Sequence, residues 1–282
     1  MTARPVVVGV KDKQPTAVRF AAEMALAHQV GLRVVHCLEI RSAGDFVSMP
    51  HDSWRAAGEA ILEDARELIQ HEHPHPSAEF RMDSGLPYYT LHEESEHATM
   101  VVVGLDAAGR LSSIFGGTVA RRLITQSAVP VAVVPERSWP SEPGGSVFVA
   151  VDARTPAAGS IRFAFAEASR RNVELHAVHV VPEREIVGDT MPHRIGVSEA
   201  LAGWSEEFPE VKVTRQFIFD DADDGCIRAT ESAALLVLGR GPDTAMGRLL
   251  GHPTLSEIAE RAHCPCIVVP DDWTGAGDGR GI

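Results

Sequence analysis

A glycine-rich segment between two apolar runs has the residue types of an anion-binding site. Val101–Val103 is a β-branched run typical of a buried strand, and Gly104 follows it directly. Gly116–Thr118 then precedes Val119–Ile124, where apolar residues recur at helical spacing and Thr118 is the expected N-cap. The first turn of a helix carries unpaired N–H groups and partial positive charge, which glycines let an anion approach. These residues indicate an anion site, with a plain capped helix as the alternative.

Two clusters contain potential metal ligands. Cys264 and Cys266 flank a proline, but no second cysteine pair accompanies them. His71, His73 and His75 alternate within HEHPHP, which two prolines interrupt, so an exposed helix end is the simpler interpretation. We therefore predict no metal site.

Single polar residues on the apolar runs also have two interpretations. Asp152 ends one run, where it could contact a ligand or bind the N–H groups of its own turn. His36 and His179 lie within apolar runs and are expected to be satisfied core histidines. The spacing supports no Ser-His-Asp set and no carboxylate pair, so no catalytic residue is predicted.

The order of apolar runs occurs twice along the chain, which indicates an internal duplication. The matching segments are 6–10 with 147–151, 32–36 with 175–179, 101–104 with 236–239, and 129–135 with 264–270. We predict one domain at 1–136 and a second at 147–271. The segment 137–146, rich in Pro, Gly and Ser, is the expected linker, and 272–282 is expected to be a disordered tail.

Strands and helices are predicted to alternate within each copy. The predicted strands of the first copy are 5–10, 32–38, 78–82, 101–104 and 131–134. Its predicted helices are 16–30, with Gly31 as the stop, 54–71, 86–97 and 119–124. The predicted strands of the second copy are 147–152, 173–181, 211–219, 235–239 and 266–270. Its predicted helices are 157–171, about 193–207, 222–233 and 254–262. Such alternation is typical of an α/β fold with a doubly wound parallel sheet.

Composition narrows the class of protein. The chain has 282 residues, 44% hydrophobic and 23% charged, and no apolar run approaches the length of a bilayer span. No signal segment is recognised at the N-terminus, so a cytoplasmic location is expected. The net charge of −13 disfavours binding to nucleic acid. We expect neither a nucleic-acid partner nor a membrane partner.

The glycine-rich segment resembles the signature of the universal stress protein family: Gly, two residues, Gly, nine residues, Gly-Ser/Thr. Gly104, Ala107, Gly117 and Thr118 fall on its positions, with Ala107 replacing a glycine. The resemblance extends over both halves and implies two tandem Rossmann-like (adenine nucleotide alpha hydrolase-like) domains. Each would be a five-stranded parallel sheet of order 3-2-1-4-5 with helices on both faces.

In nucleotide-binding members of this family, the loop wraps the phosphates of ATP. The ligand-binding residues that the resemblance implies here are Val10, Lys11, Gly104, Ala107, Gly117, Thr118, Val119, Asp152 and Gly239. The first copy has Lys11 where such members have Asp, whereas the second keeps Asp152. In the second copy, Pro242 falls on the second motif position. The last pair falls on His252–Pro253 or, with a one-residue insertion, on Gly251–His252, so the hydroxyl is missing either way. ATP is therefore expected in the first copy if it is bound at all.

These features predict a tandem universal stress protein that acts as a regulator in the stress response. The alternatives are a protein-interaction module of the same fold that binds no nucleotide, and a weak nucleotide hydrolase. The last strand of each copy is apolar and would be a sheet edge. By the same resemblance, we expect it to pair in a homodimer or in a pseudo-dimer within one chain.

Overall fold

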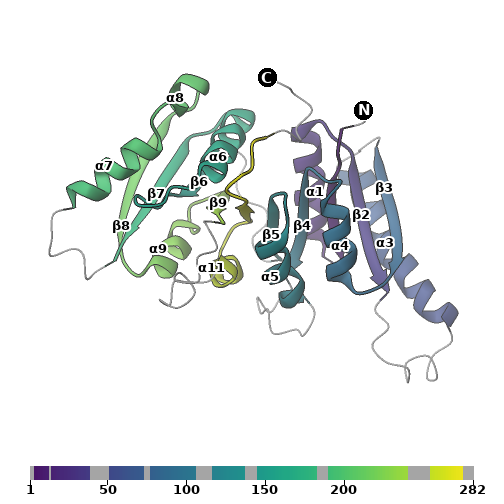
Figure 1. The fold of residues 1–282 in the computed structure, drawn as a ribbon. Coiled ribbons are helices and arrows are strands. Elements are labelled where there is room, and N and C mark those ends of the chain that lie inside the picture. Colours follow the sequence, from purple (N-terminus) through teal and green to yellow (C-terminus); the bar gives the residue numbers. More distant parts are fainter. Residues whose placement is uncertain are drawn as a thin grey trace. The chain divides into compact units, whose positions relative to one another are not determined.

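Strands and helices alternate along the chain and form two α/β units in this computed structural model (Figure 1). The structure describes residues 3–12, 14–38, 51–72, 77–105, 116–136, 145–182, 190–240 and 255–275. The described residues up to Glu136 form the first unit, and those from 145 to Gly275 form the second. The two units are described separately below.

Five parallel strands form the sheet of each unit. The order is β3-β2-β1-β4-β5 in the first unit and β8-β7-β6-β9-β10 in the second. Counted within its own unit, each sheet has the order 3-2-1-4-5, which confirms the predicted fold. The strands of the first unit are β1 (Val6–Val10), β2 (Leu32–Leu38), β3 (Ala78–Ser84), β4 (Met100–Leu105) and β5 (Val131–Pro135). Those of the second are β6 (Val147–Ala150), β7 (Leu175–Val181), β8 (Val213–Phe219), β9 (Leu235–Gly239) and β10 (Cys266–Val269).

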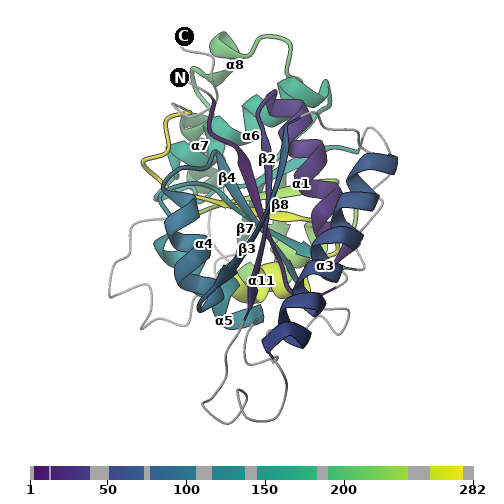
Figure 2. The same ribbon diagram turned by 90° about the vertical axis from the view of Figure 1, so that its right-hand side faces the viewer.

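Helices cover both faces of each sheet. Because crossovers between parallel strands are right-handed, the reversal of strand order after the third strand moves the later helices to the opposite face. Figure 2 shows α1 and α3 to the right of the first sheet and α4 to its left. The helices of the first unit are α1 (Pro15–His28), α3 (His51–Glu72), α4 (Pro87–Ser95) and α5 (Gly116–Gln126). Those of the second are α6 (Ala158–Arg171), α7 (Met191–Ala200), α8 (Trp204–Glu207), α9 (Ala222–Ala229) and α11 (Leu255–Arg261).

The central strands form the core of each unit. Every residue of β4 and β5 is buried, as are all four residues of β10. Burying a valine or leucine side chain stabilises a fold by roughly 1.5–3 kcal/mol, so these runs supply much of the driving force for folding. Within the described ranges, no helix combines the length and the apolar character that crossing a bilayer requires.

Two expected helix signals, the stop at Gly31 and the N-cap at Thr118, are wrong. The helix expected to stop at Gly31 ends earlier, because Gln29 takes a left-handed φ of 56° and Val30 N–H bonds back to the Ala25 carbonyl. Asn172 ends α6 in the same way, with φ 53°, directly after Arg171, where the sequence predicts the end of this helix. Thr118 is not an N-cap, because α5 already begins at Gly116.

The helix expected near 193–207 is two helices. α7 ends at Ala200, and Gly203, with φ 84°, separates it from α8. This left-handed conformation suits glycine and interrupts the helical hydrogen bonds.

Trp273, which falls in the segment expected to be a disordered tail, packs edge-on against Phe163 of α6 at 5.2 Å between ring centroids.

Candidate functional site

A cavity of about 360 Å³ opens at the carboxyl ends of β1, β2 and β4 in the first unit. Strand order reverses between β1 and β4, and parallel α/β sheets bind their ligands at such a point. Its lining is mostly apolar and comes from every layer of the unit. The lining residues are Gly9, Val10, Lys11, Gln14, Val35, His36, Cys37, Leu38, Trp54, Ala57, Gly58, Ile61, Pro87, Leu91, Val103, Gly104 and Val119.

The structure brings four of the predicted site residues together in this cavity. Val10 and Lys11 reach it from the end of β1, Gly104 from β4, and Val119 from the first turns of α5. Gly117 and Thr118 form the start of α5 beside Val119, and Ala107 lies outside the described residues. The N-terminal end of α5 therefore lies next to the cavity. The ligand contacts of these residues stay predictions.

Gln14 is a lining residue that sequence analysis missed. It is nearly buried just before α1, and its side-chain oxygen accepts a hydrogen bond from Lys11 N–H at 3.2 Å. A Cβ on Gly104 would lie 2.8 Å from the Gln14 side-chain nitrogen, so the glycine makes room for this amide. No spacing rule connects Gln14 with Gly104, and their proximity follows from the pairing of β1 with β4.

His36 and the α3 residues of the cavity were also missed. His36 Nδ1 lies 2.9 Å from the carbonyl oxygen of Val10, so the expectation of a bonded core histidine holds for this nitrogen. The ring also lines the cavity, together with Trp54 and Gly58 of α3. Two features of the sequence could have pointed to them: a histidine near the carboxyl end of an apolar strand, and a glycine inside a long helix.

In the second unit, the predicted site residue Asp152 forms hydrogen bonds within its own turn. Asp152 follows β6 and accepts hydrogen bonds from Arg154 N–H at 2.8 Å and from the Thr155 hydroxyl at 2.9 Å. Burial tends to raise the pKa of Asp152, but these hydrogen bonds and nearby His179 outweigh it and leave the pKa below its ordinary value. The carboxylate thus binds its own turn, which is the local alternative considered from the sequence.

Gly239 of the second unit is a packing residue of the β9–α6 contact. A Cβ there would lie 2.4 Å from the Ala157 Cβ and 2.9 Å from the Ser160 hydroxyl oxygen. Its lack of a side chain is thus explained by close approach of helix and strand. The motif positions Pro242, His252 and Pro253 lie outside the described residues.

His179 occupies in the second unit the position that His36 has in the first. Its Nδ1 lies 2.8 Å from the Val151 carbonyl oxygen, and its Nε2 lies 2.9 Å from His193 Nδ1 on α7. Burial lowers the pKa of His179, the proximity of His193 and Arg154 adds to this, and the Val151 carbonyl and Asp152 oppose it. The expectation of a satisfied core histidine is therefore confirmed for both ring nitrogens of His179.

Lowering the pH from 7.5 to 5 should destabilise the second unit through His179. Its folded-state pKa is depressed, so the unfolded chain binds a proton that the folded unit does not. The stabilisation is complete above the ordinary histidine pKa of about 6.5 and declines below it, by up to about 1.4 kcal/mol per pH unit until the folded-state pKa is reached. Urea unfolding followed at Trp204 measures this slope. His179→Asn keeps a donor to Val151 and removes the titration, so an equal slope in both proteins would contradict the prediction.

Three cysteines of the second unit are buried. Burial, with a smaller contribution from Asp223, raises the pKa of Cys226 to about 12. A hydrogen bond with Cys264 and burial raise the pKa of Cys266 well above its ordinary value.

Among the residues that the structure describes, no group of three or more His, Cys, Asp or Glu side chains is arranged to hold a metal ion. His71 lies at the end of α3, and His73 and His75 lie outside the described residues.

Comparison with known proteins agrees with the fold. A model of the universal stress protein family matches residues 2–135 and again residues 145–270. A universal stress protein of Mycobacterium tuberculosis is 28% identical over 95% of this chain and 97% of its own length. One from Mycolicibacterium smegmatis is 29% identical over 94% of this chain and 96% of its own.

A solved structure shows the same architecture. The crystal structure of a universal stress protein from Archaeoglobus fulgidus superposes with a TM-score of 0.70 at 18% identity, over 95% of this chain and 97% of the other. At this identity the likeness concerns the fold alone. Together with the two family matches, which cover both units, these findings identify the chain as a member of the universal stress protein family in its tandem form.

Proposed function

We propose that the first unit binds a nucleotide, with ATP as the first candidate, in the cavity beside Lys11, Gly104 and Val119. The observation that carries this proposal is the cavity itself, which lies where strand order reverses and where α5 begins. Small-molecule sites are concave, mostly apolar and supplied with a few polar groups, and cavities of about 300–1,000 Å³ are typical. The cavity meets that description.

Different parts of the cavity lining suit the base and the phosphates of a nucleotide. The apolar side chains of Val35, Ile61 and Leu91, with the Trp54 indole, suit a planar base. The first turn of α5, whose N–H groups have no partner within the helix itself, and the exposed Lys11 suit phosphate oxygens. Because these groups supply local positive potential, an anion can bind there despite the net charge of −13.

The second unit supports a different role. Asp152 already binds Arg154 N–H and Thr155 within its own turn, so a ligand would have to displace both bonds. We propose that this unit binds no nucleotide and serves as an interaction module. The protein would thus be a cytoplasmic regulator in the stress response, without dedicated enzymatic chemistry. Pairing through the last strand of each unit, with a second copy or within the chain, is part of the same proposal.

Alkylation of Cys37 tests the proposal directly. Cys37 lines the cavity and is partly exposed, whereas Cys226, Cys264 and Cys266 are buried. We expect a maleimide to label Cys37 first in the native protein, and ATP with Mg²⁺ to slow that labelling. At ten times the Kd, about one molecule in eleven is unliganded, so the rate should fall about tenfold.

Two controls make the labelling experiment specific. Cys37→Ser should abolish the fast labelling, which verifies that this thiol is the one followed. Calorimetric titration with ATP and Mg²⁺ gives the Kd independently. A labelling rate unchanged by millimolar ATP, together with no calorimetric heat, would rule out nucleotide binding in the first unit.

A further inference from the structure

One edge of β8 lies unpaired at the side of the second sheet. The strand order β8-β7-β6-β9-β10 places β8 outermost, with β7 on one edge and no described strand on the other (Figure 1). Such an edge presents a row of N–H and C=O groups to a further strand, and proteins commonly protect it with charged side chains. The sequence of β8, VTRQFIF, contains a single charge, that of Arg215.

Large apolar side chains are exposed beside this edge. Phe219, at the end of β8, is 43% exposed, and Met191 and Ile195 of α7 are 54% and 50% exposed. Contact between α7 and β8 is made where the Arg194 guanidinium lies 4.9 Å from the centroid of the Phe217 ring. Met191 and Ile195 lie within one helical turn of Arg194, so an apolar patch adjoins the unpaired edge.

Two hydrogen bonds show which backbone groups of β8 point outward. The Lys212 carbonyl, just before β8, accepts from Leu175 N–H at 2.9 Å, and Asp220 N–H, just after β8, donates to the Val181 carbonyl at 3.2 Å. Alternate residues of a strand direct their N–H and C=O groups to opposite edges, so the even-numbered residues face β7. The residues whose backbone groups face away from β7 are Val213, Arg215, Phe217 and Phe219.

We propose that β8 pairs antiparallel with β8 of a second copy of this chain, about a twofold axis at Gln216. This register aligns the whole strand and sets outward backbone groups against outward backbone groups. Arg215 then lies opposite Phe217 of the second copy, Val213 lies opposite Phe219, and each such pair exchanges two hydrogen bonds. The Arg215–Phe217 pair also brings a cation to an aromatic ring. This interface is separate from the last strands of the two units and does not depend on nucleotide binding.

Charge disfavours the other symmetric arrangements. An axis at Arg215 would place two guanidinium groups opposite each other, and an axis at Phe217 would shorten the paired segment. The outermost strand of the first sheet, β3, is also unsuited to pairing with itself. Aligned over its full length, β3 would set Arg81 against Arg81 and Glu79 against Asp83. Because like charges directly opposite each other destabilise a strand pair, β8 is the edge that suits a second copy.

A disulfide tests this register. Gln216 would face its own copy as a non-hydrogen-bonded pair, with Cα atoms about 4.5 Å apart, which a disulfide can bridge. In a Cys37→Ser background, whose other cysteines are buried, Gln216→Cys treated with diamide should give a disulfide-linked dimer on a non-reducing gel. Thr214→Cys is the matched control. Thr214 is also partly exposed and lies on the same face of β8, but its copy would be about 14 Å away, too far for a disulfide.

Sedimentation equilibrium of the full chain measures the association without a cross-link. Arg215→Pro should lower the mass of the assembly by half, because proline removes an outward N–H group and leaves the hydrogen bonds to β7 in place. Arg215→Lys keeps both the N–H group and the charge, so it should keep the mass of the original protein. Should Arg215→Pro fail to fold, the disulfide experiment decides alone.

Several results would overturn the inference. One is an original protein with the mass of a single chain, and another is an unchanged mass in folded Arg215→Pro, since pairing through the last strands alone would give that result. Equal cross-linking of Gln216→Cys and Thr214→Cys would contradict the register. Without a Gln216→Cys dimer, a link from this cysteine to a different protein in a cell lysate would assign the edge to a foreign strand and not to a second copy.

Discussion

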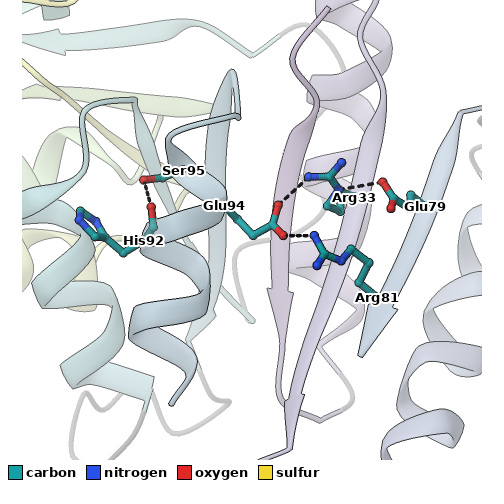
Figure 3. Close-up of polar contacts among 6 residues, drawn as sticks. All are labelled: Arg33, Glu79, Arg81, His92, Glu94 and Ser95. Atoms are coloured by element: carbon teal, nitrogen blue, oxygen red, sulfur yellow. Dashed lines mark hydrogen bonds and ion pairs between the residues drawn. The ribbon is translucent and has the colours of Figure 1, made fainter. Parts of the chain in front are cut away.

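Replacing Glu94 by glutamine should lower the free energy of unfolding of the first unit by about 3 kcal/mol. The Glu94 side chain is 9% exposed and lies on α4, facing the strands. One carboxylate oxygen accepts from Arg33 Nη1 at 2.6 Å, and the other accepts from Arg81 (Figure 3). Glutamine would remove the negative charge that two neighbouring guanidinium groups share. The loss falls at the lower end of the range for buried ion pairs, because Arg81 is 45% exposed and screened by water.

A neighbouring carboxylate provides the matched control. Glu79, on β3, accepts a hydrogen bond from the same Arg33 at 2.8 Å (Figure 3). Its side chain is 54% exposed. Exposed pairs contribute about 0–1 kcal/mol, so Glu79→Gln should change stability little. The ¹⁹F resonance of fluorotryptophan at Trp54 reports unfolding of the first unit during a urea titration. Equal destabilisation by the two substitutions would show that burial of Glu94 does not matter.

The sheet topology was predictable because its causes are local and repeated. Runs such as Val6–Val10 and Val101–Val103 contain little besides β-branched residues, and the second half repeats their order. A buried parallel strand has apolar residues on both faces, whereas a surface helix has polar residues on one face. These runs therefore indicate strands. The strand order then followed from the family resemblance, and the pairing of both sheets confirms it.

Helix ends were less predictable because they depend on hydrogen bonds, not on residue type alone. Gly31 is the residue whose type favours a left-handed stop, yet Gln29 takes that conformation. The bonds from Gln29 N–H to Ala25 and Leu26, and from Val30 N–H to Ala25, satisfy the last carbonyls and offset the cost of a left-handed glutamine. Asn172 repeats the solution in the second unit, so the arrangement belongs to the fold.

The residues of the candidate site were predictable at the ends of strands but not on the helices. Lys11 and Gly104 stand at strand ends, and parallel strands bring their carboxyl ends to one edge. Gln14, Trp54 and Gly58 come from helices, and which helix residues reach the cavity depends on helix rotation and on the α3–β2 contact. The orientation of the His36 ring follows from the contact of its Nδ1 with the Val10 carbonyl oxygen, which no sequence pattern specifies.

Replacing Gly159 by alanine should destabilise the second unit by about 3 kcal/mol. Gly159 is the second residue of α6, where alanine would otherwise be favoured by up to about 1 kcal/mol. Its Cβ would lie 2.3 Å from the Pro270 carbonyl oxygen and 2.9 Å from that of Asp271. Both are backbone atoms that follow β10 directly, so they cannot rotate away as a side chain can. Relief requires α6 to move from the sheet, which opens a buried contact.

The same displacement should be visible at an aromatic pair. Phe163 of α6 packs edge-on against Trp273 at 5.2 Å between ring centroids, and Trp273 N–H bonds to the Pro270 carbonyl, the group that alanine would strike. Gly159→Ala should therefore shift the ¹⁹F resonance of fluorotryptophan at Trp273 in the folded state and lower the urea midpoint of the second unit. Gly31→Ala is the control, because its Cβ would come no closer than 3.5 Å to any neighbour. If Gly159→Ala proves as stable as Gly31→Ala, with Trp273 unshifted, then α6 does not pack against the end of β10 as tightly as these contacts require.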